Sequence, residues 1–224
     1  MARFASTFVF LLGTLLLGAS SVLAQSGGDV SDALQVSDFQ CAVQNGWSYT
    51  IIRSYHSYGG VDSNCPQNIA NANTAGLSPV DIYHFPCYGG VSASQQVSDD
   101  LNAISAAGQS FGTIWFDIET NPSSGCGWSG DTNANCNFIG GLISAAQGAG
   151  ATVGIYASSY MWSNLAGSCT AGSDAGAALW YAHYDGNPSF SDFNPFGGWT
   201  SPTMKQYADS VGFCGLNADA DYRP

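Results

Sequence analysis

The chain has 224 residues and a formal net charge of −12, because 16 Asp and Glu stand against four Lys and Arg. Its hydrophobic share of 45% is enough for a packed core and excludes a disordered chain. Binding of nucleic acid is excluded too, because phosphate contacts need clustered basic side chains, and only Arg53, Lys205 and Arg223 follow residue 24.

The first 24 residues have the pattern of an export signal. Arg3 precedes an apolar run over residues 8–17, and residues 22–24 end in the small Ala that a signal peptidase requires. Glycine and serine interrupt the run well short of the ~20 apolar residues of a spanning helix. We therefore expect a signal peptide over 1–24, a secreted or endolysosomal (phagolysosomal) product, and no membrane span in the mature chain.

Apolar, β-rich runs alternate with helical patterns along the rest of the chain. Helical periodicity covers residues 92–107, where Val97, Leu101 and Ile104 recur on one face, and it returns from Phe138 to Ala146. The strand-like runs are 50–55, 81–85, 112–119, 152–158, 179–184, 203–208 and 218–222. Such alternation predicts a parallel sheet with helices outside it.

Toward the C-terminus the spaces between strands shorten and become Gly, Ser, Asn and Pro-rich loops. A barrel whose last strands lack full helices fits this pattern better than an open sheet does. We predict one α/β domain over residues 25–224 with an irregular TIM-like β/α barrel, and we expect a monomer. No glycine-rich phosphate motif follows any strand, so we expect no nucleotide cofactor.

Two carboxylates share one face of the run over residues 112–119. In a strand, Ile114 and Phe116 would face the helices, while Trp115, Asp117 and Glu119 would point into the barrel. Glu119 is the only glutamate in the chain, and it stands at the carboxyl end of the strand, where barrel enzymes carry their chemistry. A strand-end acid can simply cap the next helix, but two acids facing inward repel each other, which favours a functional site.

This carboxylate pair suits glycoside hydrolysis. One carboxyl group must stay protonated to donate to the leaving oxygen, while its neighbour stays ionised. Apolar surroundings and the charge of Asp117 are expected to raise the pKa of Glu119, which makes Glu119 the candidate general acid. Sugar sites also need flat aromatic faces, for which the side chains at strand ends are the candidates.

Several short segments, each a weak signal alone, form an informative series. They are Gly28-Asp29-Val30-Ser31, Asp38-Phe39-Gln40-Cys41, Val61-Asp62-Ser63-Asn64-Cys65, Tyr83-His84-Phe85, Trp115-Phe116-Asp117-Ile118-Glu119, Leu179-Trp180-Tyr181-Ala182 and Cys214-Gly215 through Ala218-Asp219. In this order they resemble glycoside hydrolase family 25, the lysozymes with a flattened β/α barrel, and most closely its secreted invertebrate and protist-type members.

The resemblance implies roles for the acids and contacts for the substrate. Glu119 would be the acid and later the base, Asp117 would orient the substrate acetamido group or an oxazolinium-like intermediate, and Asp29 and Asp219 would be the outer acids, with Asp221 an alternative to Asp219. The implied substrate is the β-1,4 bond between N-acetylmuramic acid and N-acetylglucosamine in bacterial peptidoglycan. Substrate-binding candidates are Tyr83, Tyr156, Trp180 and Gln206. Members of the family often carry Trp where this chain has Lys205, which bears on the subsite contacts.

Two other functions are weighed against this one. A chitinase would carry D-x-x-D-x-D-x-E, but Gly112 and Trp115 occupy the two upstream acidic positions. A carbohydrate-binding barrel without activity would not need the lone Glu119 in its acidic cluster.

Seven cysteines in an exported chain indicate disulfides. Zinc is disfavoured, because no two cysteines have C-x2-C spacing, and we expect no metal. Spacing alone leaves many pairings open. We predict Cys126–Cys136 from their short separation and, from placement at element ends, Cys65–Cys87 and Cys41–Cys214. Cys169 would then be the odd thiol.

Overall fold

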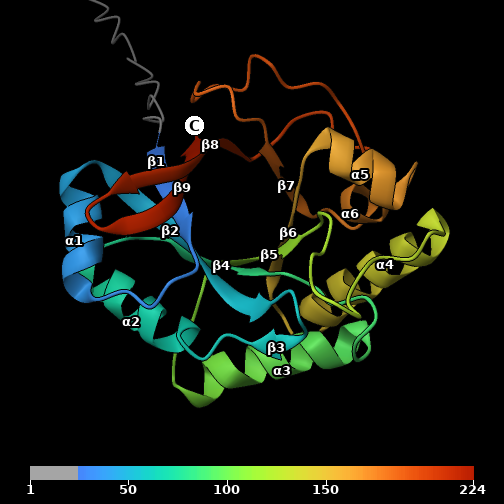
Figure 1. The fold of residues 1–224 in the computed structure, drawn as a ribbon, viewed down its shortest axis with the longest axis horizontal. Coiled ribbons are helices and arrows are strands. Elements are labelled where there is room, and N and C mark those ends of the chain that lie inside the picture. Colours follow the sequence, from blue (N-terminus) through green and yellow to red (C-terminus); the bar gives the residue numbers. More distant parts are fainter. Residues whose placement is uncertain (1–24) are drawn as a thin grey trace, which may run out of the picture.

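The computed structural model describes residues 25–224 and shows a closed β-barrel with helices outside it (Figure 1). The strand order β1-β9-β8-β7-β6-β5-β4-β2 closes through pairing of β2 with β1, and β3 forms a hairpin with β2. The strands are β1 (Gln25–Val30), β2 (Trp47–His56), β3 (Gly60–Val61), β4 (Val80–His84), β5 (Thr113–Asp117), β6 (Thr152–Ala157), β7 (Ala178–Ala182), β8 (Met204–Phe213) and β9 (Leu216–Arg223). The predicted α/β barrel is confirmed.

The strand directions bring one set of strand ends together. The pairs β1–β2, β2–β4, β4–β5, β5–β6, β6–β7 and β7–β8 are all parallel, so their carboxyl ends lie at one mouth of the barrel. Strand β9 runs antiparallel to β8 and β1 and places Asp219 opposite Asp29. The first half of β9 therefore also reaches this mouth.

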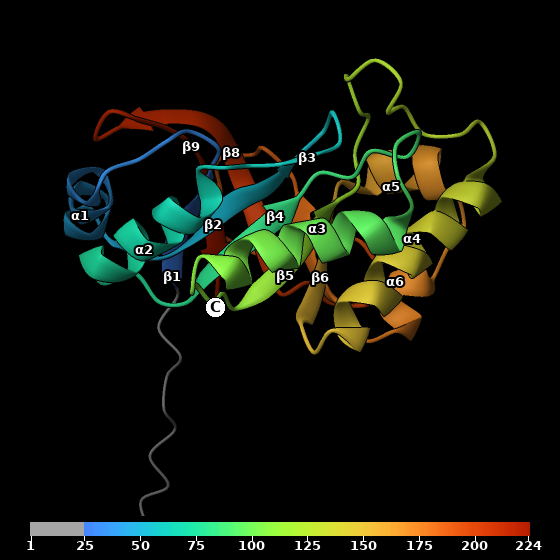
Figure 2. The same ribbon diagram turned by 90° about the horizontal axis from the view of Figure 1, so that it is seen from below.

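Helices cover only part of the barrel circumference. They are α1 (Val36–Gln44), α2 (Cys65–Ala75), α3 (Ala93–Ala106), α4 (Thr132–Gly148), α5 (Ser159–Ala166) and α6 (Ala171–Asp174). Figures 1 and 2 show them along the sides formed by β1 through β7, whereas a long loop follows β7 and a tight hairpin joins β8 to β9. The prediction that the last strands lack full helices is thus confirmed.

Alternation along the strands separates two apolar layers. In β5, Ile114 and Phe116 pack in the large core beneath the helices, and Ile118 continues that side beyond the strand. Trp115 instead belongs to a smaller cluster inside the barrel. This inner cluster also contains Tyr49, Ile51, Tyr156, Trp180 and Met204. Period-two alternation therefore places Asp117 on the inner face, as predicted.

Helix α3 follows the periodicity expected for residues 92–107. Ser92 caps it by accepting a hydrogen bond from Gln95 N at 3.2 Å, and Val97 and Ile104 are buried. Asp100 of this helix is buried, and its Oδ2 lies 2.8 Å from His84 Nδ1. This contact connects the helix to the end of β4.

The disulfide predictions were correct for one pair. Cys41–Cys214 is present, but the other bonds are Cys87–Cys126 and Cys136–Cys169, and Cys65 is the free, buried cysteine. The predicted Cys126–Cys136 and Cys65–Cys87 bonds are wrong, as is the assignment of Cys169 as the odd thiol. Cys87 and Cys126 follow the neighbouring strands β4 and β5, while Cys136 lies on α4 beside the segment after α5. Spatial neighbourhood, and not short sequence separation, decides these pairs.

Within residues 25–224, no helix is both long and apolar enough to cross a membrane. The predicted signal peptide over residues 1–24 lies outside the described part of the chain.

Candidate active site

Glu119 and Asp117 lie where β5 ends at the mouth of the barrel. The strand closes with Asp117, which is 7% exposed, and Glu119 follows two residues later with its side chain half-buried. Trp128 Nε1 donates to the Glu119 carbonyl oxygen at 2.7 Å, which fixes the backbone beyond the strand. One carboxyl group is thus enclosed and the other opens toward solvent.

A glutamine joins the two outer acids. Gln206 Nε2 donates to Asp29 Oδ2 at 2.6 Å and to Asp219 Oδ2 at 3.1 Å. Its carbonyl Oε1 accepts from the hydroxyls of Tyr156 at 2.6 Å and Tyr184 at 2.8 Å. Gln206 therefore holds strands β1, β6, β8 and β9 in one polar network at the mouth.

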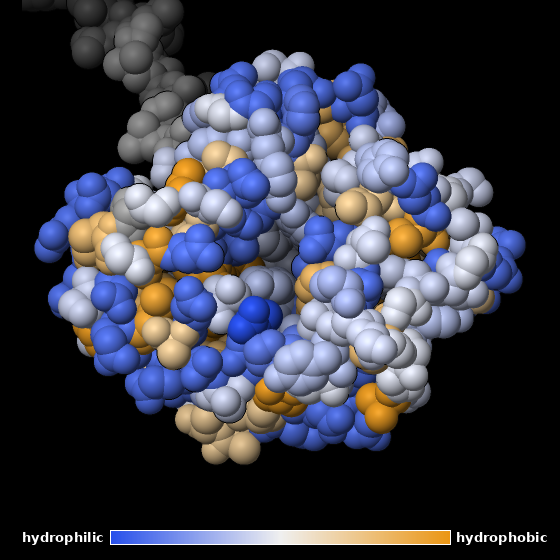
Figure 3. Space-filling view, in the orientation of Figure 1, coloured by the Kyte–Doolittle hydropathy of each residue, from blue (hydrophilic) through white to orange (hydrophobic). Residues whose placement is uncertain are grey.

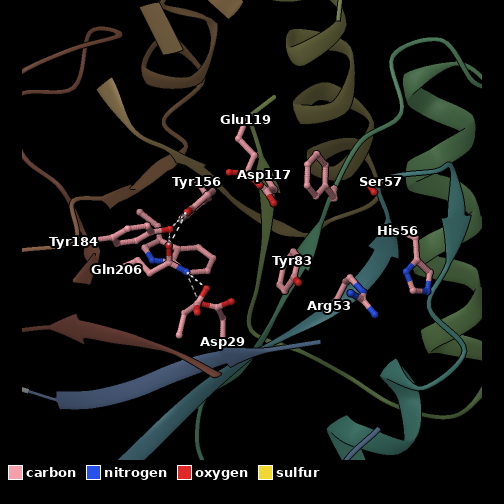
Figure 4. A pocket seen from close by; sticks show the side chains of 13 residues that line it. Asp29, Arg53, His56, Ser57, Tyr83, Asp117, Glu119, Tyr156, Tyr184 and Gln206 are labelled. Atoms are coloured by element: carbon pink, nitrogen blue, oxygen red, sulfur yellow. Dashed lines mark hydrogen bonds between the residues drawn. The ribbon is translucent and has the colours of Figure 1, made fainter. Parts of the chain in front are cut away.

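These residues surround a single cavity of ≈ 290 Å³. Figure 3 shows the same face of the molecule hollowed near its centre, with mostly hydrophilic side chains around the hollow. In Figure 4, Tyr184 and Gln206 lie at one end, Arg53 and His56 at the other, and Asp117 and Glu119 between them. The lining residues are Asp29, Arg53, His56, Ser57, Tyr83, Phe85, Asp117, Glu119, Tyr156, Trp180, Tyr184, Gln206 and Asp219.

Every residue predicted for catalysis or substrate binding lines this cavity. The four acids and the four binding candidates, Tyr83, Tyr156, Trp180 and Gln206, come from seven different strands or strand ends. Of the two alternatives on β9, Asp219 is the one that lines the cavity. Asp221 is fully buried below it and accepts from Trp180 Nε1 at 2.8 Å.

Burial raises the pKa values of the acids. Desolvation, followed by the charges of Glu119 and Asp29, raises the pKa of Asp117 well above its usual range. Desolvation, then the charge of Asp219, raises the pKa of Glu119. The same two causes raise the pKa of Asp29 to about 7. The cluster thus retains protons at a pH where isolated carboxyl groups are ionised.

Arg53, His56, Ser57, Phe85 and Tyr184 also line the cavity, although the sequence reasoning did not select them. A signal for Arg53 was available, because Tyr49 and Ile51 face inward and alternation extends that face to Arg53. A register shift between Arg53 and Tyr55 interrupts the pattern before His56. The same alternation, extended from Trp180 along the predicted run 179–184, also reaches Tyr184, although β7 itself ends at Ala182.

Lys205 lies outside the cavity, in a cluster under the loop after β7. It is fully buried, and its Nζ donates to both carboxylate oxygens of Asp185 at 2.9 Å and to Asp192 Oδ1 at 2.8 Å. Together with His183, these aspartates have the spacing of a metal site. The Lys205 ammonium supplies the positive charge for both carboxylates, so the donor set does not require a metal.

Comparison with known proteins identifies the family. The family described as "Lysozyme-like protein 1" matches residues 20–207. "Probable GH family 25 lysozyme 4" of Dictyostelium discoideum is 39% identical over 218 residues, covering 97% of this chain and 96% of the relative. "Lysozyme-like protein 5" of Caenorhabditis elegans is 40% identical over 215 residues, covering 94% and 97%.

A solved structure shares the fold at low sequence identity. The family GH25 lysozyme from Aspergillus fumigatus superposes with a TM-score of 0.73 at 20% identity, covering 90% of this chain and 94% of that one. The barrel, the matching family and the full-length relatives agree. The chain belongs to the glycoside hydrolase family 25 lysozymes and is a glycoside hydrolase.

Proposed function

We propose that this protein hydrolyses the β-1,4 bond between N-acetylmuramic acid and N-acetylglucosamine in bacterial peptidoglycan, with Glu119 as general acid assisted by Asp117. The observation that carries the proposal is the pairing of a half-buried Glu119 with a buried Asp117 at the carboxyl end of β5, inside the one cavity that all the predicted site residues line.

The different burial of the two carboxyl groups supports this division of roles. Glu119 opens toward solvent and can reach the oxygen of a glycosidic bond, so it delivers the proton to the leaving sugar. Asp117 lies deeper, with its Oδ1 lacking a hydrogen-bond partner among the described residues, and is available to a substrate group or to developing positive charge. After the first sugar leaves, Glu119 accepts a proton from the incoming water.

The outer acids and the aromatic side chains would position the glycan. Gln206 keeps Asp29 and Asp219 at fixed places, and its tyrosine partners Tyr156 and Tyr184 form one wall. Tyr83 and Trp180 add apolar faces of the kind on which sugar rings pack.

We further propose that the protein acts outside the cytosol, in the extracellular space or an endolysosomal lumen. Three disulfides support this proposal, because such bonds persist in oxidising compartments.

Replacement of Glu119 by Gln tests the function directly. The variant should fold normally and lose peptidoglycan hydrolysis by about 10² or more, because a positioned general acid contributes that much. Release of reducing sugar is measured on peptidoglycan and on colloidal chitin, with circular dichroism as the folding check and Asp32→Asn, an exposed acid, as the control. Cleavage of chitin in preference to peptidoglycan, or an active Glu119→Gln, would contradict the proposal.

A further inference from the structure

One end of the cavity differs in charge from the rest of the site. Among the described residues that line it, Arg53 and His56 are those that can carry positive charge, and they lie together at the end away from Tyr184 (Figure 4). The remaining charged lining residues are Asp29, Asp117, Glu119 and Asp219. The cavity is therefore polarised along its length.

The Arg53 side chain is already held in place. Its Nε donates to Asp62 Oδ2 at 2.8 Å, and one terminal nitrogen, Nη2, donates to the Ser31 carbonyl oxygen at 2.7 Å. A guanidinium has five N–H donors, so three remain for a ligand, and 24% of the side chain is exposed. Because Asp62 and Ser31 fix the rotamer, a ligand meets a preorganised fork and loses little side-chain entropy on binding.

Two further polar side chains, His56 and Ser57, line the cavity beside Arg53. His56 Nε2 lies 3.5 Å from the same Asp62 oxygen, and the Ser57 hydroxyl lies 2.8 Å from the Ser123 hydroxyl. Asp62 offsets part of the local positive charge, so recognition here depends on the directed N–H donors more than on net charge. A planar carboxylate matches this arrangement better than an uncharged sugar hydroxyl does.

We propose that Arg53, with His56 beside it, binds a carboxylate of the peptide stem attached to muramic acid, and that this contact favours peptide-bearing glycan over uncharged glycan. The inference rests on the proposed function, because the peptide stem belongs to the same peptidoglycan substrate and would bind at this end of the cavity. The stem hangs from the lactyl group of muramic acid and carries carboxylates, whereas chitin carries none. The contact therefore acts on substrate selection and leaves the proton transfers to Glu119.

Binding of three synthetic muramyl oligosaccharides of equal length tests the site. One has a peptide stem with free carboxylates, one has the same stem as carboxamides, and one has no stem, with its lactyl carboxyl group converted to a carboxamide so that it carries no charge. Kd is measured by calorimetry with Glu119→Gln, which does not cleave the ligand. We expect the free carboxylate to bind about tenfold more tightly than the carboxamide, as expected for hydrogen bonds to a charged group. Equal Kd values for these two ligands would overturn the proposal.

Variants then locate the effect. In the same background, Arg53→Gln should reduce the tenfold preference to near one, while Arg223→Gln, which makes an equal charge change outside the cavity, should retain it. Because Arg53→Gln removes the partner of buried Asp62, Arg53→Lys is measured beside it and should lower the preference about threefold, since it keeps the charge and loses the fork. A preference retained in both Arg53 variants would overturn the assignment. Turnover of these ligands by the unmodified enzyme tests the proposed function separately.

Discussion

Gln206 shows how one neutral side chain organises several charged ones. Its amide nitrogen donates to Asp29 and Asp219, and its carbonyl accepts from Tyr156 and Tyr184. A carboxylate at this position would add a fifth acid to the four that line the cavity, and an aliphatic side chain would remove the Gln206 donor from buried Asp29 and from half-buried Asp219. The amide therefore lets the acids stand close together while their protons remain exchangeable.

The influence of Asp219 on Glu119 leads to a prediction about pH. After desolvation, the Asp219 charge is the cause that raises the pKa of Glu119. Replacing Asp219 by Asn removes this charge and lowers the Glu119 pKa, so the acid loses its proton at a lower pH. The alkaline limb of the kcat/KM profile should move to lower pH by about half a unit to one unit, the size typical of one nearby charge.

The measurement is a profile of kcat/KM from pH 3.5 to 8, with Asp32→Asn as a matched control that removes an exposed acid. The control should keep the limb of the unmodified enzyme. A limb that stays in place or moves to higher pH in Asp219→Asn would mean that another carboxyl group donates the proton.

The sequence was enough to predict the strand that carries Asp117 and Glu119, but not all the residues that line the cavity. Asp117 and Glu119 were predictable because two acids at alternate positions in an apolar strand have no structural need to face inward together. His56 was not, because a register shift between Arg53 and Tyr55 interrupts the alternation of β2 before it. The shift depends on how β2 pairs with β4, which the residues near His56 in the sequence do not encode.

The loop between β7 and β8 is fixed by a buried cation. Lys205 on β8 holds Asp185 and Asp192, which both belong to this loop, and Gly186 N donates to the Tyr207 carbonyl oxygen at 2.9 Å. Burial opposes ionisation of Asp192, yet hydrogen bonds from Lys205, His183 and Tyr181 lower its pKa. Asp185 directly follows Tyr184, so the Lys205 contacts also position one wall of the cavity.

Replacement of Lys205 by Met should therefore have two effects, one on the stability of the protein and one on substrate binding. Loss of the buried partner should lower the unfolding free energy by about 3 kcal/mol, since two carboxylates lose their cation. Release of the loop should raise KM severalfold by freeing Tyr184, with less effect on kcat. Urea unfolding and steady-state kinetics measure the two effects.

A double-mutant cycle with Tyr184→Phe separates this positioning role from general destabilisation. If Lys205 acts through Tyr184, then Lys205→Met should add little to KM in the Tyr184→Phe background, although it still lowers stability. Multiplicative increases in KM would show that Lys205 does not act through this tyrosine.

Helices and strands were predictable where the pattern that indicates them lies within one short segment of the sequence. The amphipathic pattern of α3 and the apolar strands are encoded in residues close together in sequence, and they were found. The disulfides Cys87–Cys126 and Cys136–Cys169 join segments that become neighbours only when β4 pairs with β5 and α4 packs against α5. Short separation favoured Cys126–Cys136, but these cysteines bond to partners 39 and 33 residues away, respectively.

The whole molecule has a net charge of −12, and several of its carboxyl groups lie inside the barrel. Asp29, Asp81, Asp117 and Asp221 are buried, and desolvation is the largest cause of the raised pKa of each. The folded state therefore binds protons that the unfolded chain releases near pH 4. Stability contributed by these protons is complete at low pH and is lost as the pH rises through the folded-state pKa values.

Thermal stability should accordingly be greatest on the acidic side and fall toward pH 8. For Asp29 the pKa rises from 3.8 to about 7, which corresponds to a loss on the order of 4 kcal/mol of unfolding free energy across that window. Below pH 4 the trend reverses, because the lowered pKa values of Asp185 and Asp192 make their protonation unfavourable to the folded state. We expect the highest Tm between about pH 4 and 5.

Scanning calorimetry from pH 3 to 8 measures this curve, and Asp29→Asn assigns part of it. The variant cannot ionise at that position, so its Tm should fall less between pH 4.5 and 8 than the Tm of the unmodified protein does. The Tm of the Asp32→Asn control should follow that of the unmodified protein. The mutual repulsion among the 16 acids, which four bases offset only in part, acts in the same direction but is spread over many groups, so Asp29→Asn removes little of it. A Tm that rises from pH 4.5 to 7.5, or an equal fall in Asp29→Asn, would show that the buried carboxyl groups do not control the stability of this barrel.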